Sequence, residues 1–261
     1  MGASIDYLLH LADNALVLGQ RNAEWCGHGP ILEEDIALAN VSLDLIGQAR
    51  LLYQLVATLK GGDVTEDKLA YFREVGDFRN YTLLELPHHG PLSGYAHADL
   101  DYATTIVRNF LYSALMALLW EALQKSSNAD LAAIAAKSLK EVSYHLRYSR
   151  DWLVRLGDGT DESQARTQAA LNHLMPYTEE FWAACPAESE ALAGGVGVDL
   201  QSLKADWNGI VDAALGEAML KRPSTAGCYV PEGKKGLHSE HLGYLLAEMQ
   251  SLARAHPNGC W

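Results

Sequence analysis

The sequence predicts an all-α fold, an enlarged long four-helix bundle with additional helices packed on it at the C-terminal end. Apolar residues recur at every third or fourth position over long stretches, which is the period of a helix that buries one face. Alternating runs of β-branched residues do not occur, so strand signals are nearly absent. Four helical stretches of roughly 20 to 30 residues have the number and length typical of a bundle. Because no repeat or low-complexity linker divides the chain, we expect one domain over residues 1–261, with the core bundle at about 4–157 and extra helices at about 160–256.

The first two predicted helices are separated by a strong chain break. The first covers about 5–24 and ends before a glycine-rich break that includes Gly27 and Pro30. The second covers about 31–60, and acidic residues in its first turns suit the helix dipole. Gly61 is expected to close this helix as a C-cap.

A short helix and a long connection are expected next. Asp63 and Glu66 match the spacing of a capping box, for a helix that ends at about residue 74. Residues 75–97 are rich in proline, glycine and histidine, and we expect them to cross the surface as a long excursion.

The remaining predicted helices fill the rest of the chain. They cover about 99–124, 128–156, 160 onward, 199–221 and 239–255. Asn128 and Asp199 are expected as N-caps and Gly157 as a C-cap. Pro176 interrupts the helix that starts near residue 160 and predicts a kink there. A polar loop is expected over 222–237.

Composition excludes several classes of function. The chain has 33 acidic and 20 basic residues, and its formal net charge of -13 argues against binding to nucleic acid or to an anionic membrane surface. No uninterrupted run of about 18 apolar residues is present, so no membrane span is predicted. The four cysteines are scattered without a C-x-x-C pair, and the chain starts without a signal-peptide pattern. These features together predict a cytoplasmic protein.

Long helical bundles often hold a di-iron site, which the sequence allows us to test. That site takes a Glu from each of two helices and a Glu-x-x-His pair from each of the other two. Of the 10 histidines, only His88 has a glutamate three positions before it, at Glu85, and Pro87 lies between them in a turn-rich segment. We interpret this match as chance. The sequence therefore predicts no metal ligand set and no catalytic residue in this chain.

Other polar residues lie on helix faces that are otherwise apolar. Asp44 and Gln48 are four positions apart on one predicted helix, and Glu141 and His145 are four apart on another. They indicate either a non-standard metal or substrate site, or a buried hydrogen-bonded network that fixes the register of the helices. We favour the network. Its counter-charges are expected from Arg50, Arg147 and Arg150.

A basic loop near the C-terminal end suggests a binding role. Lys234 and Lys235 lie between two glycines, and His238 follows shortly after. The two lysines, with His238, are expected either to bind an acidic partner or the phosphates of coenzyme A, or to form an ordinary solvated loop.

Several stretches of the chain together resemble one protein family. They read DNALVLGQR at 13–21, EWCGH at 24–28, DLIGQAR at 44–50, KEVSYHLR at 140–147, LGDGTD at 156–161 and GKKGLHSEHLG at 233–243. In combination they resemble the C subunits, the structural subunits, of bacterial multicomponent phenylacetyl-coenzyme A 1,2-epoxidases. The resemblance covers essentially the whole chain, with local departures at 88–97 and at Ser113, where an acidic residue is expected.

The resemblance implies a ferritin-like fold and a cytoplasmic, non-catalytic role in aerobic phenylacetate catabolism. It implies that the chain binds and stabilises a homologous catalytic A subunit in a hetero-oligomer. That partner would carry the di-iron centre and receive electrons from an NADPH-dependent reductase, whereas this chain would bind no cofactor. The partner's Asp-Glu-x-Gly-His motif falls on residues 44–48, with Leu45 at the glutamate ligand and Gln48 at the histidine ligand.

Two other functions stay open. In the first, the chain is a catalytic di-iron oxygenase with non-standard ligands. In the second, it is a stand-alone helical binding or storage protein. The ligands of the first alternative would be Asp44, Glu121, Glu141 and His145. A homodimer is also compatible with the sequence.

Overall fold

The computed structural model describes residues 5–89, 100–257 and 259. Within these residues the fold is helical and contains no strand, so the all-α prediction is confirmed. The part of the predicted surface excursion at 90–97 lies outside the described residues.

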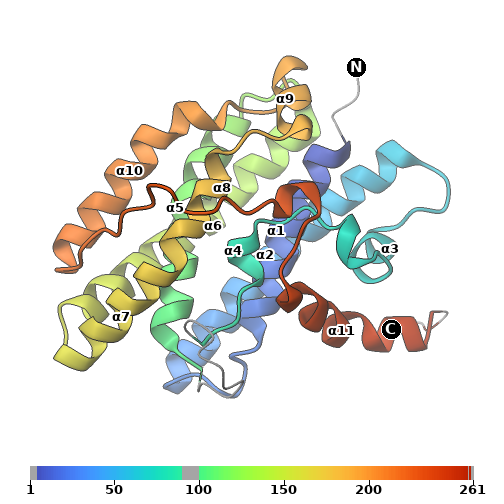
Figure 1. The fold of residues 1–261 in the computed structure, drawn as a ribbon. Coiled ribbons are helices and arrows are strands. Elements are labelled where there is room, and N and C mark those ends of the chain that lie inside the picture. Colours follow the sequence, from blue (N-terminus) through green and yellow to red (C-terminus); the bar gives the residue numbers. More distant parts are fainter. Residues whose placement is uncertain (1–4, 90–99, 258, 260–261) are drawn as a thin grey trace.

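Four long helices form the bundle. They are α1 (Ile5–Ala23), α2 (Leu32–Lys60), α5 (Tyr102–Leu123) and α6 (Ala129–Gly157). α1 packs along α2, α5 packs along α6, and α2 also contacts α6, which joins the two pairs (Figure 1). This is the four-helix arrangement of a ferritin-like fold, as predicted.

The helix α5 lies at the centre of the molecule, where α6, α7 (Asp161–Leu174) and α10 (Leu200–Glu217) all contact it. Among the described residues, only α5 is long and apolar enough to cross a membrane, and 78% of its most apolar stretch is buried inside the fold. Its place between other helices accounts for this apolar sequence, because a helix surrounded on every side is apolar all round.

Short elements connect the outer helices. η2 (Met175–Thr178), α8 (Glu179–Trp182) and α9 (Pro186–Ala193) lead from α7 to α10. At Pro176 we expected a kink within one helix. Instead α7 ends at Leu174, and the proline lies in the 3₁₀ turn η2, where its missing N–H leaves no hydrogen bond unmade.

The C-terminal helix α11 (Glu240–Ala255) extends away from the bundle and packs across α3 (Glu66–Tyr71) (Figure 1). One continuous apolar core nevertheless reaches from α1 to α11, since Leu8 and Leu245 belong to the same buried cluster.

Several predicted helix caps are present. The Asn128 side chain accepts a hydrogen bond from the Leu131 N–H at 2.8 Å, and Asp199 accepts one from the Gln201 N–H at 3.0 Å. Gly61 closes α2 at a φ of 69°, a left-handed value that glycine adopts without strain.

The cap predicted for α3 is wrong. The N-cap is Thr65, whose hydroxyl accepts from the Lys68 N–H, and Asp63 instead forms an exposed ion pair with the Lys68 side chain at 2.6 Å. Asp63 and Thr65 both have side chains that can cap a helix, and Thr65, directly before the first helical residue, is the one that does so.

The surface excursion predicted from residue 75 is also wrong over its described part. The chain forms η1 (Val75–Asp77) and α4 (Thr82–Glu85), and α4 packs against α1. Phe78 and Tyr81 are fully buried. The turn-rich composition of this segment concealed that its aromatic side chains point into the core.

Candidate functional site

The face between α2 and α6 holds most of the residues that the sequence singled out. Leu45 and Gln48 are three positions apart on α2, and Val142 and His145 are three apart on α6. All four side chains are buried. Each helix therefore presents the i, i+3 spacing of a Glu-x-x-His pair, but with an apolar residue at both glutamate positions.

Two hydrogen-bonded pairs cross from α2 to α6. Gln48 Nε2 donates to Glu141 Oε2 at 2.9 Å, and His145 Nε2 lies 3.0 Å from Asp44 Oδ2. Gln48 and His145 are buried, whereas Asp44 and Glu141 are half-buried at the rim. The four polar residues are therefore brought together as two parallel pairs, which fix the register of two antiparallel helices.

Burial lowers the pKa of His145, although the hydrogen bond and charge of Asp44 oppose the shift. The ring is therefore neutral near pH 7, and its Nε2–H donates to the Asp44 carboxylate. This is a structural hydrogen bond rather than an acid–base pair aimed at a cavity.

The counter-charges predicted for these pairs are wrong. Arg50 lies 3.6 Å from Glu66, Arg150 lies 2.5 Å from Glu217, and the Arg147 guanidinium lies over the ring of Tyr144. The cation that reaches the site is Lys137, whose Nζ lies 3.5 Å from Glu141 one helical turn away. The arginines point outward because their positions fall on the solvent side of each helix.

The residues present do not fit a di-iron centre. Leu45 and Val142 have no atom that ligates iron, and an amide such as Gln48 is a poor substitute for imidazole. Over the described ranges, no group of three or more His, Cys, Asp or Glu side chains is placed to hold a metal ion. Glu121, a ligand in the catalytic alternative, is exposed near the end of α5, and Ser113 is a buried hydroxyl in mid-helix.

The side chains of the single Glu-x-x-His match, Glu85 and His88, do not point toward a common site. Glu85 accepts hydrogen bonds from the Ser239 N–H at 2.6 Å and lies 2.8 Å from His238 Nδ1. The ring nitrogens of His88 instead lie 2.6 Å from the carbonyl oxygen of Arg21 and 2.6 Å from Thr105 Oγ1. Both side chains are buried and occupied by different partners, which agrees with a chance match.

The basic loop is not a solvent-facing site at Lys234. This side chain is buried, its ammonium lies 2.8 Å from Glu188 Oε2, and it also donates to the carbonyl oxygen of Ala183 at 2.5 Å. The prediction that Lys234 binds a phosphate or a partner is therefore wrong, because an internal carboxylate already neutralises it. Lys235 does face solvent, where it pairs with Glu232 at 2.5 Å.

The His238 side chain also contacts groups inside the fold. Its Nδ1 faces the buried Glu85, and its Nε2 lies 2.9 Å from the carbonyl oxygen of Phe78. Burial alone would lower the pKa of His238, but the hydrogen bond and charge of Glu85 outweigh it and raise the pKa above its usual value. The loop before α11 is thus tied to the core through side chains that we expected at the surface.

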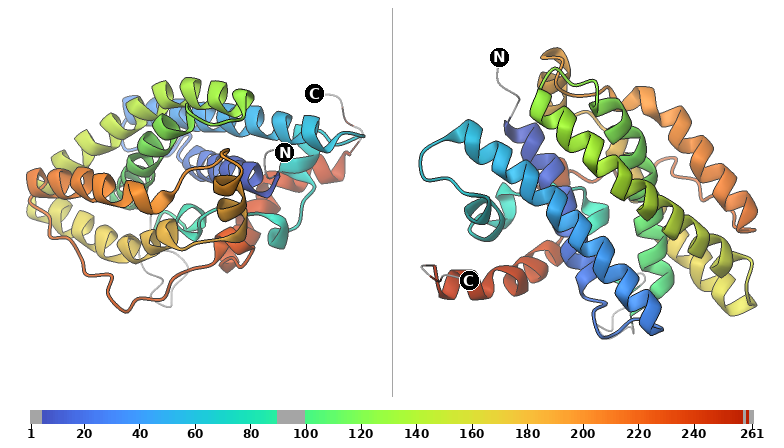
Figure 2. Two further views of the ribbon diagram at one scale, coloured as in Figure 1. Left: turned by 90° about the horizontal axis from the view of Figure 1, so that it is seen from above. Right: turned by 180° about the vertical axis from the view of Figure 1, so that it is seen from behind.

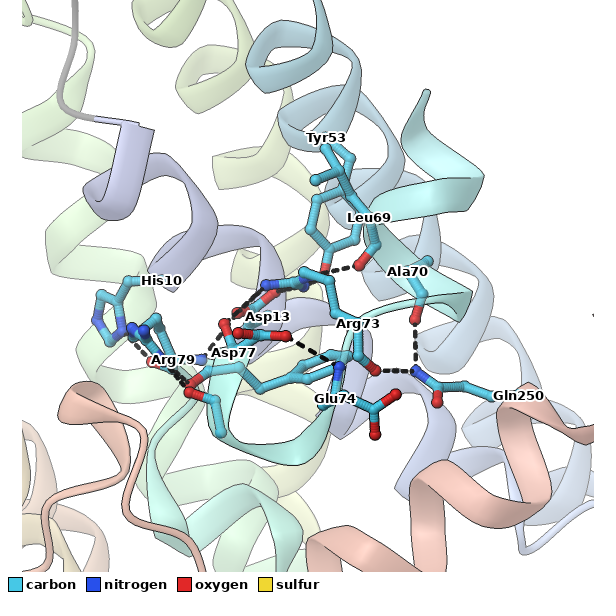
Figure 3. A network of polar contacts seen from close by, with 12 residues as sticks. His10, Asp13, Tyr53, Leu69, Ala70, Arg73, Glu74, Asp77, Arg79 and Gln250 are labelled. Carbon is cyan, nitrogen blue, oxygen red and sulfur yellow. Dashed lines mark hydrogen bonds and ion pairs between the residues drawn. The ribbon is translucent and has the colours of Figure 1, made fainter. Parts of the chain in front are cut away.

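A further buried network was not predicted from the sequence. Asp13 of α1 is fully buried, and its carboxylate accepts from the Tyr53 hydroxyl at 2.5 Å, from the Arg79 N–H at 2.8 Å and from the Arg73 guanidinium (Figure 3). The signal was present, since Asp13 is an acid on an apolar helix face. One of its partners, Arg79, comes from the segment predicted as a surface excursion, and Arg73 lies directly before that segment.

Arg73 also connects this network to the C-terminal helix. Its backbone carbonyl accepts hydrogen bonds from Gln250 at 3.2 Å and from Arg254 at 2.8 Å, both on α11. Gln250 bonds the Ala70 carbonyl too (Figure 3). The two α11 side chains therefore satisfy carbonyl groups at and just beyond the end of α3 that have no partner within that helix.

Comparison with known proteins agrees with this architecture. The model of the family described as "Phenylacetic acid catabolic protein" matches residues 2–261. The chain is 45% identical over 256 residues to a protein of Escherichia coli (strain K12) named as the C subunit of 1,2-phenylacetyl-CoA epoxidase, with 98% of each chain covered. By both measures the chain belongs to the phenylacetic acid catabolic protein family.

Proposed function

We propose that this chain is the non-catalytic structural subunit of a multicomponent phenylacetyl-coenzyme A epoxidase. In that complex it binds and stabilises a homologous di-iron A subunit, in the cytoplasm, during aerobic phenylacetate catabolism. The observation that carries the proposal is the pair of apolar residues, Leu45 and Val142, at the two positions where a ferritin-like bundle would carry its paired glutamates.

The family relationship supports membership of the complex. The E. coli relative is named as a subunit of an epoxidase, and its similarity extends over nearly all of this chain. The proposal is also supported by the α2–α6 contact, which consists of packed apolar side chains and two hydrogen-bonded pairs. A scaffold role requires only such a stable bundle and a surface for the partner.

Metal analysis of two preparations tests the proposal. We expect the isolated chain to contain far less iron than a di-iron site requires, even after anaerobic incubation with Fe²⁺. We also expect it to co-purify with the A subunit as one species, and the iron to follow the A subunit. Two irons per chain in the isolated protein, measured by elemental analysis, would overturn the proposal.

A further inference from the structure

The outer side of α2 is unusually apolar. Leu32, Ile36 and Leu43 are 71%, 51% and 66% exposed, and they follow one line of the helix that the exposed Asn40 interrupts between Ile36 and Leu43. The opposite side of α2 is already buried through residues such as Leu45 and Leu52. A helix with one buried face normally presents polar residues to solvent, so this second apolar line has a different use.

Beyond Leu43, the same line continues at a residue without a side chain. Gly47 lies one turn further along α2, and a Cβ added there would meet nothing within 4 Å. A glycine in a helix interior costs stability, and here no neighbour in the chain requires it. It does allow another backbone to approach α2 closely.

The neighbouring line on α6 is basic. Lys137, Lys140, Tyr144 and Arg147 follow one another at spacings of three, four and three positions. Lys140 and Arg147 are not buried, and within the described residues Lys140 has no ion-pair partner. A basic line is notable on a chain whose net charge is -13.

The two lines share one surface. The pairs Asp44–His145 and Gln48–Glu141 hold α2 and α6 side by side. Seen from behind, these two helices lie next to each other on the near side, and no other described helix crosses over them (Figure 2). We call this surface the α2–α6 face; its residues are Leu32, Ile36, Leu43, Gly47, Lys137, Lys140, Tyr144 and Arg147.

We propose that the α2–α6 face binds a long helix of the catalytic A subunit, apolar along its contact side and acidic along one flank. This inference rests on the proposed function and adds the surface and the chemistry of the contact. The apolar line on α2 has the spacing by which one helix packs against another at a small crossing angle. The adjacent basic line requires carboxylates on the helix that covers it.

The charges argue against a second copy of this chain as the occupant. In a two-fold dimer both partners present the same surface. A second α2–α6 face would bring the same lysines and arginine to the contact, whereas a helix with carboxylates along one flank would pair with them.

The test measures binding of the purified chain to the purified A subunit. Leu43→Asp places a charge in the middle of the apolar line, and we expect it to weaken binding by about thirtyfold or more, the range of an interface hot spot. Tyr244→Asp is the matched control, because Tyr244 is 65% exposed on α11, the helix that packs across α3 and extends away from the bundle. It should change the dissociation constant by less than about twofold, as a residue outside an interface does.

A second variant tests the charge. The double reversal Lys140→Glu with Arg147→Glu should slow association by about tenfold or more at low salt, and the difference should shrink at high salt because ions screen it. Circular dichroism melting of each variant establishes that it is folded, which we expect because all the substituted side chains lie at the surface.

The outcomes separate this inference from the proposed function. If the wild-type chain does not bind the A subunit, the proposed function itself fails. If the wild-type chain and Leu43→Asp bind equally well, the proposed function stands and the α2–α6 face is not the interface. If Leu43→Asp only converts a dimer of this chain into monomers in sedimentation, the face joins two copies and the inference is overturned.

Discussion

Replacing the buried Asp13 by asparagine should destabilise the fold strongly. The Asp13 carboxylate is fully buried and is the counter-ion of the Arg73 guanidinium, which is itself only 12% exposed. An asparagine side chain at this position would have nearly the same volume but no charge, and one side of its amide would present N–H groups to donors such as the Tyr53 hydroxyl. The variant Asp13→Asn thus leaves a cation buried without a partner.

The size of the effect follows from that orphaned charge. Breaking a buried ion pair by removing one partner costs about 3–5 kcal/mol. For a domain of this size each kcal/mol lowers the melting temperature by about 2–4 °C, so we expect a decrease of roughly 6–20 °C. Thermal unfolding followed by circular dichroism at 222 nm, the wavelength of the helical signal, measures it directly.

Two comparisons make this result specific to the ion pair. Asp63→Asn removes the carboxylate of the ion pair with Lys68, in which the Asp63 side chain is 94% exposed, and it should leave the melting temperature unchanged. The double variant Asp13→Asn with Arg73→Met should lose less stability than the sum of the two single variants, because it leaves no buried unpaired charge. The reasoning would be refuted if Asp13→Asn had the same melting temperature as the wild type. It would also be refuted if the double variant lost as much stability as the two single variants together.

The remaining predictions concern other parts of the fold. The raised pKa of His238 means that its bond to a buried carboxylate stabilises the protein fully below pH 6.5, the usual histidine value, and less as pH rises through the raised pKa. The stability difference between wild type and His238→Gln, from urea unfolding at a series of pH values, should therefore shrink as pH increases; a constant difference would contradict this. Gly157→Ala should cost about 1–3 kcal/mol, since its Cβ would lie too near the Ala218 carbonyl oxygen, whereas Gly47→Ala in open space should stabilise by up to about 1 kcal/mol. Glu141→Ala should leave the epoxidase activity of an assembled complex intact, and loss of that activity with assembly unchanged would favour the catalytic alternative.

The long helices could be predicted because their evidence is local. A stripe such as Leu38, Leu45 and Leu52 repeats every seven positions, so the period of α2 is visible without knowing what covers it. Caps such as Asn128 depend on residues three positions away and were also predictable. The search for a Glu-x-x-His pair is local in the same way, because it tests one spacing on one helix.

The buried polar contacts could not be predicted, because their partners are far apart in the chain. Lys234 looks like a surface lysine until α9 brings Glu188 to within 2.8 Å of it. Asp13 was visible as an acid on an apolar helix, but Arg73 lies 60 positions away, next to a segment whose composition suggested a surface loop. In both cases the sequence shows the charged residue, but only the fold brings the residue of opposite charge next to it.

The α2–α6 contact differs chemically from the ligand-lined interior of a di-iron bundle. In a di-iron bundle, inward carboxylates and imidazoles repel or remain unpaired until ions neutralise them, so the metal and the fold stabilise each other. Here Leu45 and Val142 pack without any ion, and His145 has a carboxylate partner of its own at the rim. The α2–α6 contact therefore keeps its register through its own side chains, which agrees with the structural role that we propose.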